Sequence, residues 1–581
     1  MNRRLVTTVA FGAVAVVVVP LSATATTAAW TDEEWNHGIV GTSSLICGDD
    51  TGFATTAYGR FLSGSLLGTN LNPVADLEQM RLVLDENGAL TVQPTDAVDL
   101  DPPATPPTHT YANPFDVDLL GIAGVNMSGF EVPVPGAALG AANQYAQVSE
   151  LGTAVGASGL VNNSGVVTAG TTPSASLPAP ATISLDELLP ALTGIAGADL
   201  KVGAIGASSQ LDGCAALLST LWGAGTVSGS TRDYAIAGLG LGIDVPAAGG
   251  LVGTTTTGAA TITTAVNSLL GSSGLISSVI GSRLDLALPG ALTTSIGGTV
   301  SIAGLDLAGS VTTLLNTPLT DGVVTVDLQT STVDVDLDAL LPSLNNAPPN
   351  TEVVVNSAVL APIVTRVGVL LNNWTSQVIT ALRQELRTST ITIDLNAVVA
   401  APGIFPLQPL DILNVSIDFV GQVGAILDGT AVFTVDANTA GAVGAINTLL
   451  AALALPTVTA LINTVELLSP VLVTVVANQI TTTAVGAITT LGTTLSTAVN
   501  AVIARVGSVV NALRSILSLM VNVQPDRPGA PPGSTFVAGT ADSTPQYLVS
   551  ALRIGLADAS TPASIDRVVF ATASAGPVTA P

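Results

Sequence analysis

The sequence predicts a mixed α+β protein, with β-rich N- and C-terminal parts and long apolar helices packed in the second half. Three observations predict this fold class. Runs in which apolar and polar residues alternate, as they do in half-buried strands, lie toward both ends of the chain. Apolar residues at helical spacing continue for many turns in the second half. Segments rich in proline and glycine, which end helices and strands, separate these stretches.

The first 29 residues have the pattern of a signal peptide. Met1–Arg4 is basic, and Leu5–Val19 is an apolar stretch that is long enough for a signal peptide but too short to span a bilayer. Small residues before position 30 offer cleavage sites. The last residues, Phe570–Pro581, contain neither a hydrophobic span nor a sorting signal. We therefore expect a secreted protein, or one held noncovalently at the cell surface, with no membrane span after cleavage.

Charge is scarce and mostly negative. Only 10% of the residues are charged, 48% are apolar, and the formal net charge is -26. A folded body with so few charges must present Thr, Ser, Asn and Gly to water. An acidic surface repels phosphate backbones, which argues against nucleic-acid binding. The expected partners are components of the cell envelope or a second copy of the chain.

Composition also divides the chain into segments. The residue pattern changes at three segments. Two are rich in proline, Asp99–His109 and Pro173–Pro180, and one is rich in turn residues, Gln524–Gly533. The predicted segments are the signal peptide (1–29), a β-rich N-terminal part (30–180), a mixed part with strands and long helices (181–523) and a C-terminal β-hairpin or sheet (524–581).

Strands are predicted wherever apolar and polar residues alternate between turn signals. The last two strands are expected to close the fold as a hairpin. The predicted strands lie within Met80–Val98, Ala141–Ala169, Val323–Leu328, Val333–Leu337, Thr390–Leu395, Ile412–Phe419, Tyr547–Leu556 and Ile565–Ala573.

Two long helices are predicted in the second half. The later one, Ile488–Met520, repeats apolar residues every three or four positions for more than four heptads. Its flanks carry Thr, Ala, Gly and Ser, so we expect it to pack inside its own chain against the helix before it, with an intermolecular coiled coil as the alternative. The earlier helix has an apolar stripe formed by Val359, Ile363, Val367, Leu370, Trp374, Val378, Leu382 and Leu386.

Two stretches without charge, Ala437–Val465 and Leu467–Ala504, raise the question of a membrane. Prolines, amides and a run of threonines interrupt both of them. We predict that they form core helices, and membrane insertion is the alternative.

The two cysteines, Cys47 and Cys214, are predicted to form a structural disulfide, because an isolated pair in an exported protein is usually bonded. Cys214 lies on an apolar stripe at helical spacing with Leu211, Leu218 and Trp222, and Cys47 is expected at the end of a strand. Two buried thiols or a redox site are the alternatives.

The sequence holds no pattern with catalytic, cofactor-binding or metal-binding spacing. His37 and His109 lie in an acidic lead and a proline-rich loop, and there is neither a GxSxG motif nor a phosphate-binding loop. Asp334, Asp336 and Asp338 match the first three ligand positions of a calcium loop, but its glycine and glutamate positions hold other residues. We expect the wet face of a strand, with Asp338 capping a helix, and leave cation binding open.

Several stretches together resemble a known family. They read AWTDEEW from Ala29, ATTAYGRFLSGSLLGTNL from Ala54, NPFDVDLLGIAGV from Asn113, NQYAQVSELGTAVGASGLVNNSGVV from Asn143, and ALRIGL followed by FATASAGPV near the end. Together, these stretches resemble the choice-of-anchor G family of actinobacterial surface proteins. The resemblance implies an exported protein with a large shared domain that precedes interchangeable anchors. It implies no activity and no ligand residue, and this chain ends soon after FATASAGPV.

The function expected from these observations is that of an exported extracellular or cell-surface protein of structural or adhesive type, without catalytic activity. One alternative is a secreted hydrolase that acts on a cell-envelope polymer through buried carboxylates. The other is a self-assembling component of a matrix or surface layer.

Overall fold

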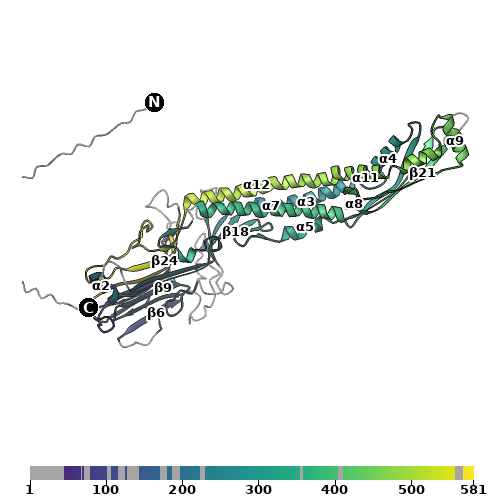
Figure 1. Cartoon of the computed structure of the whole chain (residues 1–581). Helices are drawn as coiled ribbons and strands as arrows, with labels where there is room; N and C mark the ends of the chain where they lie inside the picture. The colour runs from purple at the N-terminus through teal and green to yellow at the C-terminus, as the bar shows by residue number, and fades with distance from the viewer. Residues whose placement is uncertain are drawn as a thin grey trace, which may run out of the picture. The chain divides into compact units, whose positions relative to one another are not determined.

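The structure contains both helices and antiparallel sheets, which confirms the predicted α+β class (Figure 1). The predicted signal peptide and His37 lie outside the described residues, and Ile46–Pro581 form one unit. The computed structural model describes residues 45–66, 69–70, 79–100, 106–114, 125–126, 143–169, 180–185, 197–222, 229–353, 357–403, 410–556 and 567–581.

An eight-stranded sheet joins the two ends of this unit. β1 (Ala54–Leu66) pairs with β25 (Arg567–Thr579) along most of its length, from Ala54 opposite Thr579 to Ser65 opposite Arg567. β25 also pairs with β24 (Tyr547–Leu556), which confirms the predicted closing hairpin. The other strands of this sheet are β2 (Thr69–Asn70), β3 (Met80–Leu84), β4 (Leu90–Gln93), β19 (Thr351–Glu352) and β23 (Leu517–Val523).

A six-stranded sheet packs against the eight-stranded one, through contacts of its central strands with β1 and β25. The two sheets touch at their backbones. A Cβ atom on Gly59 of β1 would lie 1.9 Å from the carbonyl oxygen of Ala157, and a Cβ atom on Gly156 would lie 2.3 Å from that of Tyr58. The strands of this sheet are β5 (Val98–Asp99), β6 (Thr108–Pro114), β8 (Asn143–Ser149), β9 (Thr153–Gly159), β12 (Ala204–Asp212) and β13 (Ser230–Ala237).

Two further sheets complete the described strands. In the seven-stranded sheet, alternate side chains of β18 point into the core, as predicted for Val333 and Val335. The strands of this sheet are β7 (Val125–Asn126), β10 (Ala181–Ser184), β11 (Ala198–Val202), β14 (Gly240–Asp244), β16 (Leu319–Thr320), β17 (Val324–Asp327) and β18 (Thr332–Asp336). The four-stranded sheet consists of β15 (Thr293–Ala303), β20 (Thr390–Ala401), β21 (Leu410–Gln422) and β22 (Thr434–Thr439).

The helices range from single turns to the two long helices that the sequence predicts. Among them, α12 follows α11 through a π-helical turn, η5. The helices are α2 (Gly213–Trp222), α3 (Pro246–Asn267), α4 (Leu275–Ala287), α5 (Leu307–Asn316), α6 (Leu337–Leu340), η4 (Leu344–Asn346), α7 (Ser357–Thr388), α8 (Val423–Leu427), α9 (Val443–Ala452), α10 (Val458–Glu466), α11 (Ser469–Ile480), η5 (Thr481–Val485) and α12 (Gly486–Ile516).

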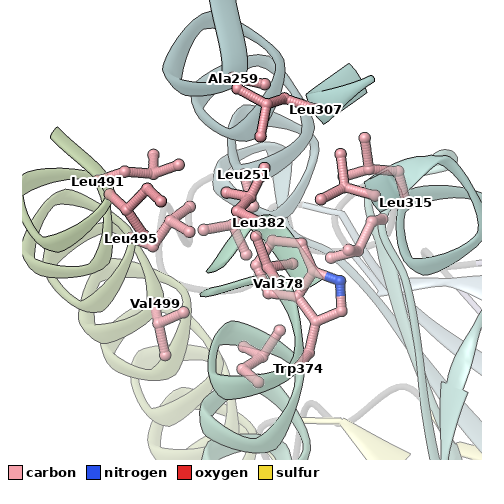
Figure 2. Close-up of a cluster of buried hydrophobic side chains, with 14 of the residues drawn as sticks. Leu251, Ala259, Leu307, Leu315, Trp374, Val378, Leu382, Leu491, Leu495 and Val499 are labelled. Carbon is pink, nitrogen blue, oxygen red and sulfur yellow. The ribbon is translucent and has the colours of Figure 1, made fainter. Parts of the chain in front are cut away.

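A continuous hydrophobic core runs between α3, α5, α7 and α12, which lie side by side (Figure 1). Figure 2 shows Trp374 of α7 at the centre of one cluster of this core, together with Leu251 of α3, Leu315 of α5 and Leu495 of α12. The predicted apolar seam of α12 is buried from Ile488 to Leu513. The expectation that this helix packs inside its own chain is therefore confirmed.

Three details of the helix predictions are corrected. The helix of the seam ends at Ile516, so Met520 belongs to strand β23. The helices that cover the seam are α7 and α3, because the helix immediately before it, α11, continues along the same run. On α7, Leu371 is buried in the position expected for Leu370, since a period of 3.6 residues allows either spacing.

The strand pairings cross the predicted segment boundaries. β24 and β25, from the predicted C-terminal segment, pair with β23 and with β1. β12, which lies beyond residue 180, pairs with β9. The proline-rich segment after Asp99 connects two paired strands, β5 and β6. Composition changes at these positions therefore mark loops inside shared sheets.

The stretches without charge form α9, α10, α11 and much of α12, as predicted, but each helix buries only one stripe. Among the described residues, one helical run, Ser469–Arg514, is long and apolar enough to cross a membrane. Its most apolar window has a mean hydropathy of 1.6, and 33% of that window is buried. Threonine is the most frequent residue at the exposed positions of this run.

Candidate anion-binding site

Three arginines converge on one pocket of the eight-stranded sheet. Arg60 of β1, Arg553 of β24 and Arg567 of β25 line a pocket of about 260 Å³. Arg553 is only 3% exposed. None of the described residues that line this pocket is an aspartate, a glutamate or a histidine. The chain as a whole has 15 basic and 41 acidic residues, so this gathering of positive charge runs against its composition.

Neighbouring strands place the three side chains together. β24, β25 and β1 are adjacent in the sheet, with Arg553 opposite Val569 and Arg60 opposite Thr572. Ala571 has a φ of 50°, which interrupts the alternation of β25. As a result, Val569 and Thr572 both line the pocket although they are three residues apart.

The connector between β23 and β24 forms another wall of the pocket, through Pro525, Gly533, Ser534 and Thr535. Arg567 Nη1 donates a hydrogen bond of 3.3 Å to the carbonyl oxygen of Pro532. The sequence predicts this connector as a turn-rich segment, and between its first residues and β24 the described chain has no helix. The connector thus covers part of the sheet and leaves a recess over the arginines.

A nearby ion pair holds the start of this connector. Arg232 of β13 donates to Asp526 over 3.0 Å from Nη2, and to the carbonyl oxygen of Leu548 over 3.1 Å from Nη1. The two side chains are 5% and 17% exposed. A buried, bidentate pair of this kind fixes geometry more than a surface pair does. The carboxylate of Asp526 is therefore committed to Arg232.

Tyr58 adds a hydroxyl group to the pocket. Burial raises the pKa of Tyr58, while a hydrogen bond with Ser574 and the positive charges of Arg60 and Arg81 act in the opposite direction. The phenol is thus neutral at physiological pH and available as a hydrogen-bond donor. Together the pocket offers guanidinium and hydroxyl donors, which suit an anionic oxygen group.

The predicted disulfide between Cys47 and Cys214 is present, with a Cα–Cα distance of 5.5 Å. Cys214 lies in α2 and is buried, as predicted, but Leu211 belongs to β12 and not to the helical stripe. Cys47 lies in an exposed turn instead of at a strand end. Closing a loop of 167 residues stabilises the fold by about 5 kcal/mol at most in the chain-entropy model.

The structure gives the three candidate ligands of a cation, Asp334, Asp336 and Asp338, different roles. Asp334 pairs with Lys201 at a partly exposed position, where an ion pair contributes little to stability. Asp336 caps α6 by accepting a hydrogen bond from the amide of Ala339 over 2.9 Å. The prediction that Asp338 caps a helix is wrong, because α6 begins at Leu337 and its N-cap is Asp336. In the described parts of the chain, no three His, Cys, Asp or Glu residues are grouped to hold a metal ion.

Asp338 instead accepts hydrogen bonds from the backbone amides of Gly238 and Leu239. Burial raises the pKa of Asp338 to about 6, the two amide bonds act in the opposite direction, and the charge of Asp336 adds to the rise. A raised carboxyl pKa is a feature that a hydrolase can use. Here the same side chain joins the loop before β14 to α6, which is a structural role.

Replacing Asp338 with asparagine is expected to flatten the dependence of stability on pH. The folded pKa lies above the unfolded value of 3.8, so the folded state binds the proton more tightly and stability falls as pH rises from about 4 to about 6. Asparagine still accepts the amide bonds and carries no charge. At pH 7, Asp338→Asn should therefore raise the free energy of unfolding by roughly 1 kcal/mol, discounted for partial exposure.

Urea unfolding at pH 4, 5, 6 and 7 measures this effect. Asp411→Asn, at an exposed position of β21, is the control and should keep the wild-type profile. A wild-type slope in Asp338→Asn between pH 4 and 6 would show that another group titrates there.

Sequence reasoning missed the arginine pocket. Its only local signal is an arginine inside each of three otherwise apolar or small-residue strands, in GRFL, ALRIG and DRVVF. Such a residue can face water or a pocket, and only the pairing of β24, β25 and β1 decides between the two. His109 lies on β6 and is half-buried, away from the described lining of this pocket.

Comparisons with known proteins give one match. The description "Domain of unknown function (DUF8394)" matches residues 57–576, which include all three arginines of the pocket. No curated protein and no solved structure matches the chain. Because the match covers most of the sequence, the chain belongs to the DUF8394 family, whose function is unknown.

Proposed function

We propose that this protein is an exported, extracellular or cell-surface protein of structural or adhesive type, without catalytic activity. The proposal is supported by the signal-peptide pattern of residues 1–29, by the Cys47–Cys214 disulfide, and by the resemblance to choice-of-anchor G proteins. Disulfides persist mainly in oxidising compartments outside the cytoplasm. These features concern where the protein acts.

One observation carries the adhesive part of the proposal. A groove of about 690 Å³ between α3 and α12 is lined only by uncharged residues, and we name it the threonine groove. Its described lining is Gly250, Gly253, Thr254, Thr257, Gly258, Thr261, Ala487, Thr490, Leu491 and Thr494. The net charge of the chain is -26. A neutral or acidic partner can therefore approach an uncharged part of its surface with less repulsion than a charged part.

The threonine side chains make this surface less polar than the sequence suggests. Thr490 donates its hydroxyl to the carbonyl oxygen of Gly486 over 3.0 Å, and Thr494 donates to Thr490 over 3.0 Å. Thr261 donates to Thr257 over 2.9 Å. The hydroxyl hydrogens of these three threonines are used inside their own helices, so the surface has fewer donors to offer water. The free-energy cost of removing water from this surface on contact with a partner is then smaller.

Fractionation of the producing cells tests both parts of the proposal. We expect protein with a cleaved leader and no free thiol outside the cytoplasm, with a portion retained on the cell surface. Thr257→Glu places a charge in the threonine groove and should shift the retained portion into the medium. Thr380→Glu, at an exposed position of α7, is the matched control and should not.

Two outcomes would contradict the proposal. Cytosolic protein with an intact leader would overturn export. Equal retention of wild type, Thr257→Glu and Thr380→Glu would remove the threonine groove from any adhesive role.

A further inference from the structure

Strand β15 lies at one end of the four-stranded sheet and pairs on one side only, with β20. A strand at the end of a sheet presents a row of backbone N–H and C=O groups that another chain can pair with. Folded proteins usually prevent such pairing with short end strands, with charged residues or with proline. β15 has 11 residues, and none of them is charged or a proline. It therefore lacks the usual protection.

The other end strands of the described sheets are short or charged. β5, β7, β16 and β19 have two residues each, and β4 has four. β13 has 8 residues and carries Arg232 and Asp233, and β22 has 6 residues and carries Asp436. Among these end strands, β15 is thus the longest, and its whole length is free of charge.

The first half of β15 is the open part of this edge. In the second half, the carbonyl oxygen of Val300 accepts a hydrogen bond of 2.8 Å from the amide of Gly271, outside the ladder with β20, and Gly298 has a φ of 106°. Because inward and outward groups alternate along an antiparallel strand, Thr294 and Ile296 turn their N–H and C=O groups to the same edge as Val300. No residue in the described part of the chain makes a backbone hydrogen bond to these outward groups.

The side chains on one face of this open half are exposed and neutral. They belong to Thr293, Ser295 and Gly297. With a net charge of -26, two copies of the chain repel one another, and the repulsion is smallest where the contact region carries no acid. Two copies of Ser295 that meet across a two-fold axis place no like charges opposite each other. A second copy therefore meets little electrostatic resistance at this edge.

Helix α4 adds exposed apolar surface beside the edge. It packs on the other face of β15, where a Cβ atom on Gly281 would lie 3.5 Å from the side chain of Ile296 and Asp285 accepts a hydrogen bond from Thr294. The next residue of the helix, Leu286, is 77% exposed. Two β15 strands paired about a two-fold axis bring two copies of α4 to the same face of the joined sheet. Docking of a second copy at this edge would thus cover apolar surface as well as pair backbone groups.

We propose that β15 is a self-association edge, at which Thr293–Gly297 pairs antiparallel with the same segment of a second copy about a two-fold axis at Ser295. The pair joins two four-stranded sheets through about four N–H···O bonds, made by Thr294 and Ile296 of each copy. An interface of this size binds weakly, so we expect a reversible dimer. The proposal rests on the edge of the sheet and does not depend on the threonine groove.

Analytical ultracentrifugation of the mature full-length protein over a concentration series tests the proposal. We expect the mean mass to rise from that of a monomer toward that of a dimer between micromolar and submillimolar concentration. Ile296→Pro removes an outward N–H group and should raise the midpoint of association at least tenfold. Ser295→Glu, which places like charges opposite each other, should do the same. Asn414→Glu, at an exposed position of β21 in the same sheet, changes net charge equally and should leave the midpoint unchanged.

A cysteine at the proposed axis locates the contact. The Cα atoms of a directly opposite pair without hydrogen bonds are about 4.5 Å apart, which a disulfide can bridge. Mild oxidation of Ser295→Cys should therefore give a covalent dimer on a non-reducing gel, and Asn414→Cys should give much less. Equal cross-linking of the two variants would contradict the proposed axis.

Two results of the concentration series would overturn the proposal. One is a protein that remains monomeric at every concentration. The other is a dimer whose midpoint is the same in wild type, Ser295→Glu and Ile296→Pro, because another surface would then hold it together. If Ile296→Pro fails to fold, as judged by circular dichroism, Ser295→Glu alone decides. Thr257→Glu, which tests the threonine groove, should leave the dimer unchanged, so failure of one proposal is distinguishable from failure of the other.

Discussion

Trp374→Ala is expected to lower the free energy of unfolding by about 3–5 kcal/mol. Trp374 of α7 is the largest side chain that is fully buried among the described residues. It packs in the core that α7 shares with α3, α5 and α12 (Figure 2). Its indole Nε1 donates a hydrogen bond of 2.8 Å to the carbonyl oxygen of Leu314. Alanine would leave a cavity against Leu315 and Leu382 and remove the donor from that carbonyl.

Thermal or urea unfolding followed by circular dichroism measures the loss. Val369→Ala is the matched control, because Val369 lies on the same helix and is 54% exposed. The control should change stability by less than about 0.5 kcal/mol. Similar losses in the two variants would mean that α7 does not bury the face that contains Trp374.

Gly156→Val is expected to prevent the correct packing of the two large sheets. A Cβ atom at this position would lie 2.3 Å from the carbonyl oxygens of both Tyr58 and Ser574, which belong to β1 and β25. Those oxygens are backbone atoms inside a paired ladder, so they cannot move aside as a side chain could. We expect loss of cooperative unfolding, or a destabilisation of more than about 3 kcal/mol, at the upper end of known overpacking costs.

The same readouts test this prediction, with Gly253→Ala as the control. A Cβ atom on Gly253 meets nothing within 4 Å, and the residue lies inside α3. Alanine there should stabilise the protein by about 0.5–1 kcal/mol. A Gly156→Val protein that unfolds cooperatively at the wild-type temperature would show that the sheets do not meet at their backbones.

Local patterns explain why much of the fold could be predicted. The seam from Ile488 to Leu513 and the stripe from Ile363 to Leu386 repeat over many turns, and such repeats identify a helix without knowledge of its partners. The closing hairpin of β24 and β25 is likewise a pairing of neighbours in sequence. The disulfide could be predicted because only two cysteines exist.

Helix α3 shows where local reasoning fails. Its sequence holds four glycines and many threonines, which disfavour a helix. Its buried positions, from Ala248 through Leu251 and Ala259 to Val266, nevertheless follow helical spacing, and the helix packs against α12 and α5. Tertiary packing therefore decides this element against its intrinsic preference.

The arginine pocket could not be predicted for a related reason. Arg60 and Arg567 are separated by some five hundred residues and become neighbours only through the pairing of β1 with β25. The pairing of the chain ends depends on contacts that are distant in sequence. The positive φ of Ala571, which lies between the lining residues Val569 and Thr572, leaves no clear mark in the sequence.

The apolar seam of α12 is covered by α3 and α7. Hydrogen–deuterium exchange of Gly486–Ile516, in buffer without detergent and then with lipid vesicles, tests whether this packing persists in water. We predict slow exchange along the helix in buffer and no change when vesicles are added, because α3 and α7 already cover its seam. Rapid exchange in buffer, with protection that develops only in the presence of vesicles, would mean that lipid, and not α3 and α7, covers the seam.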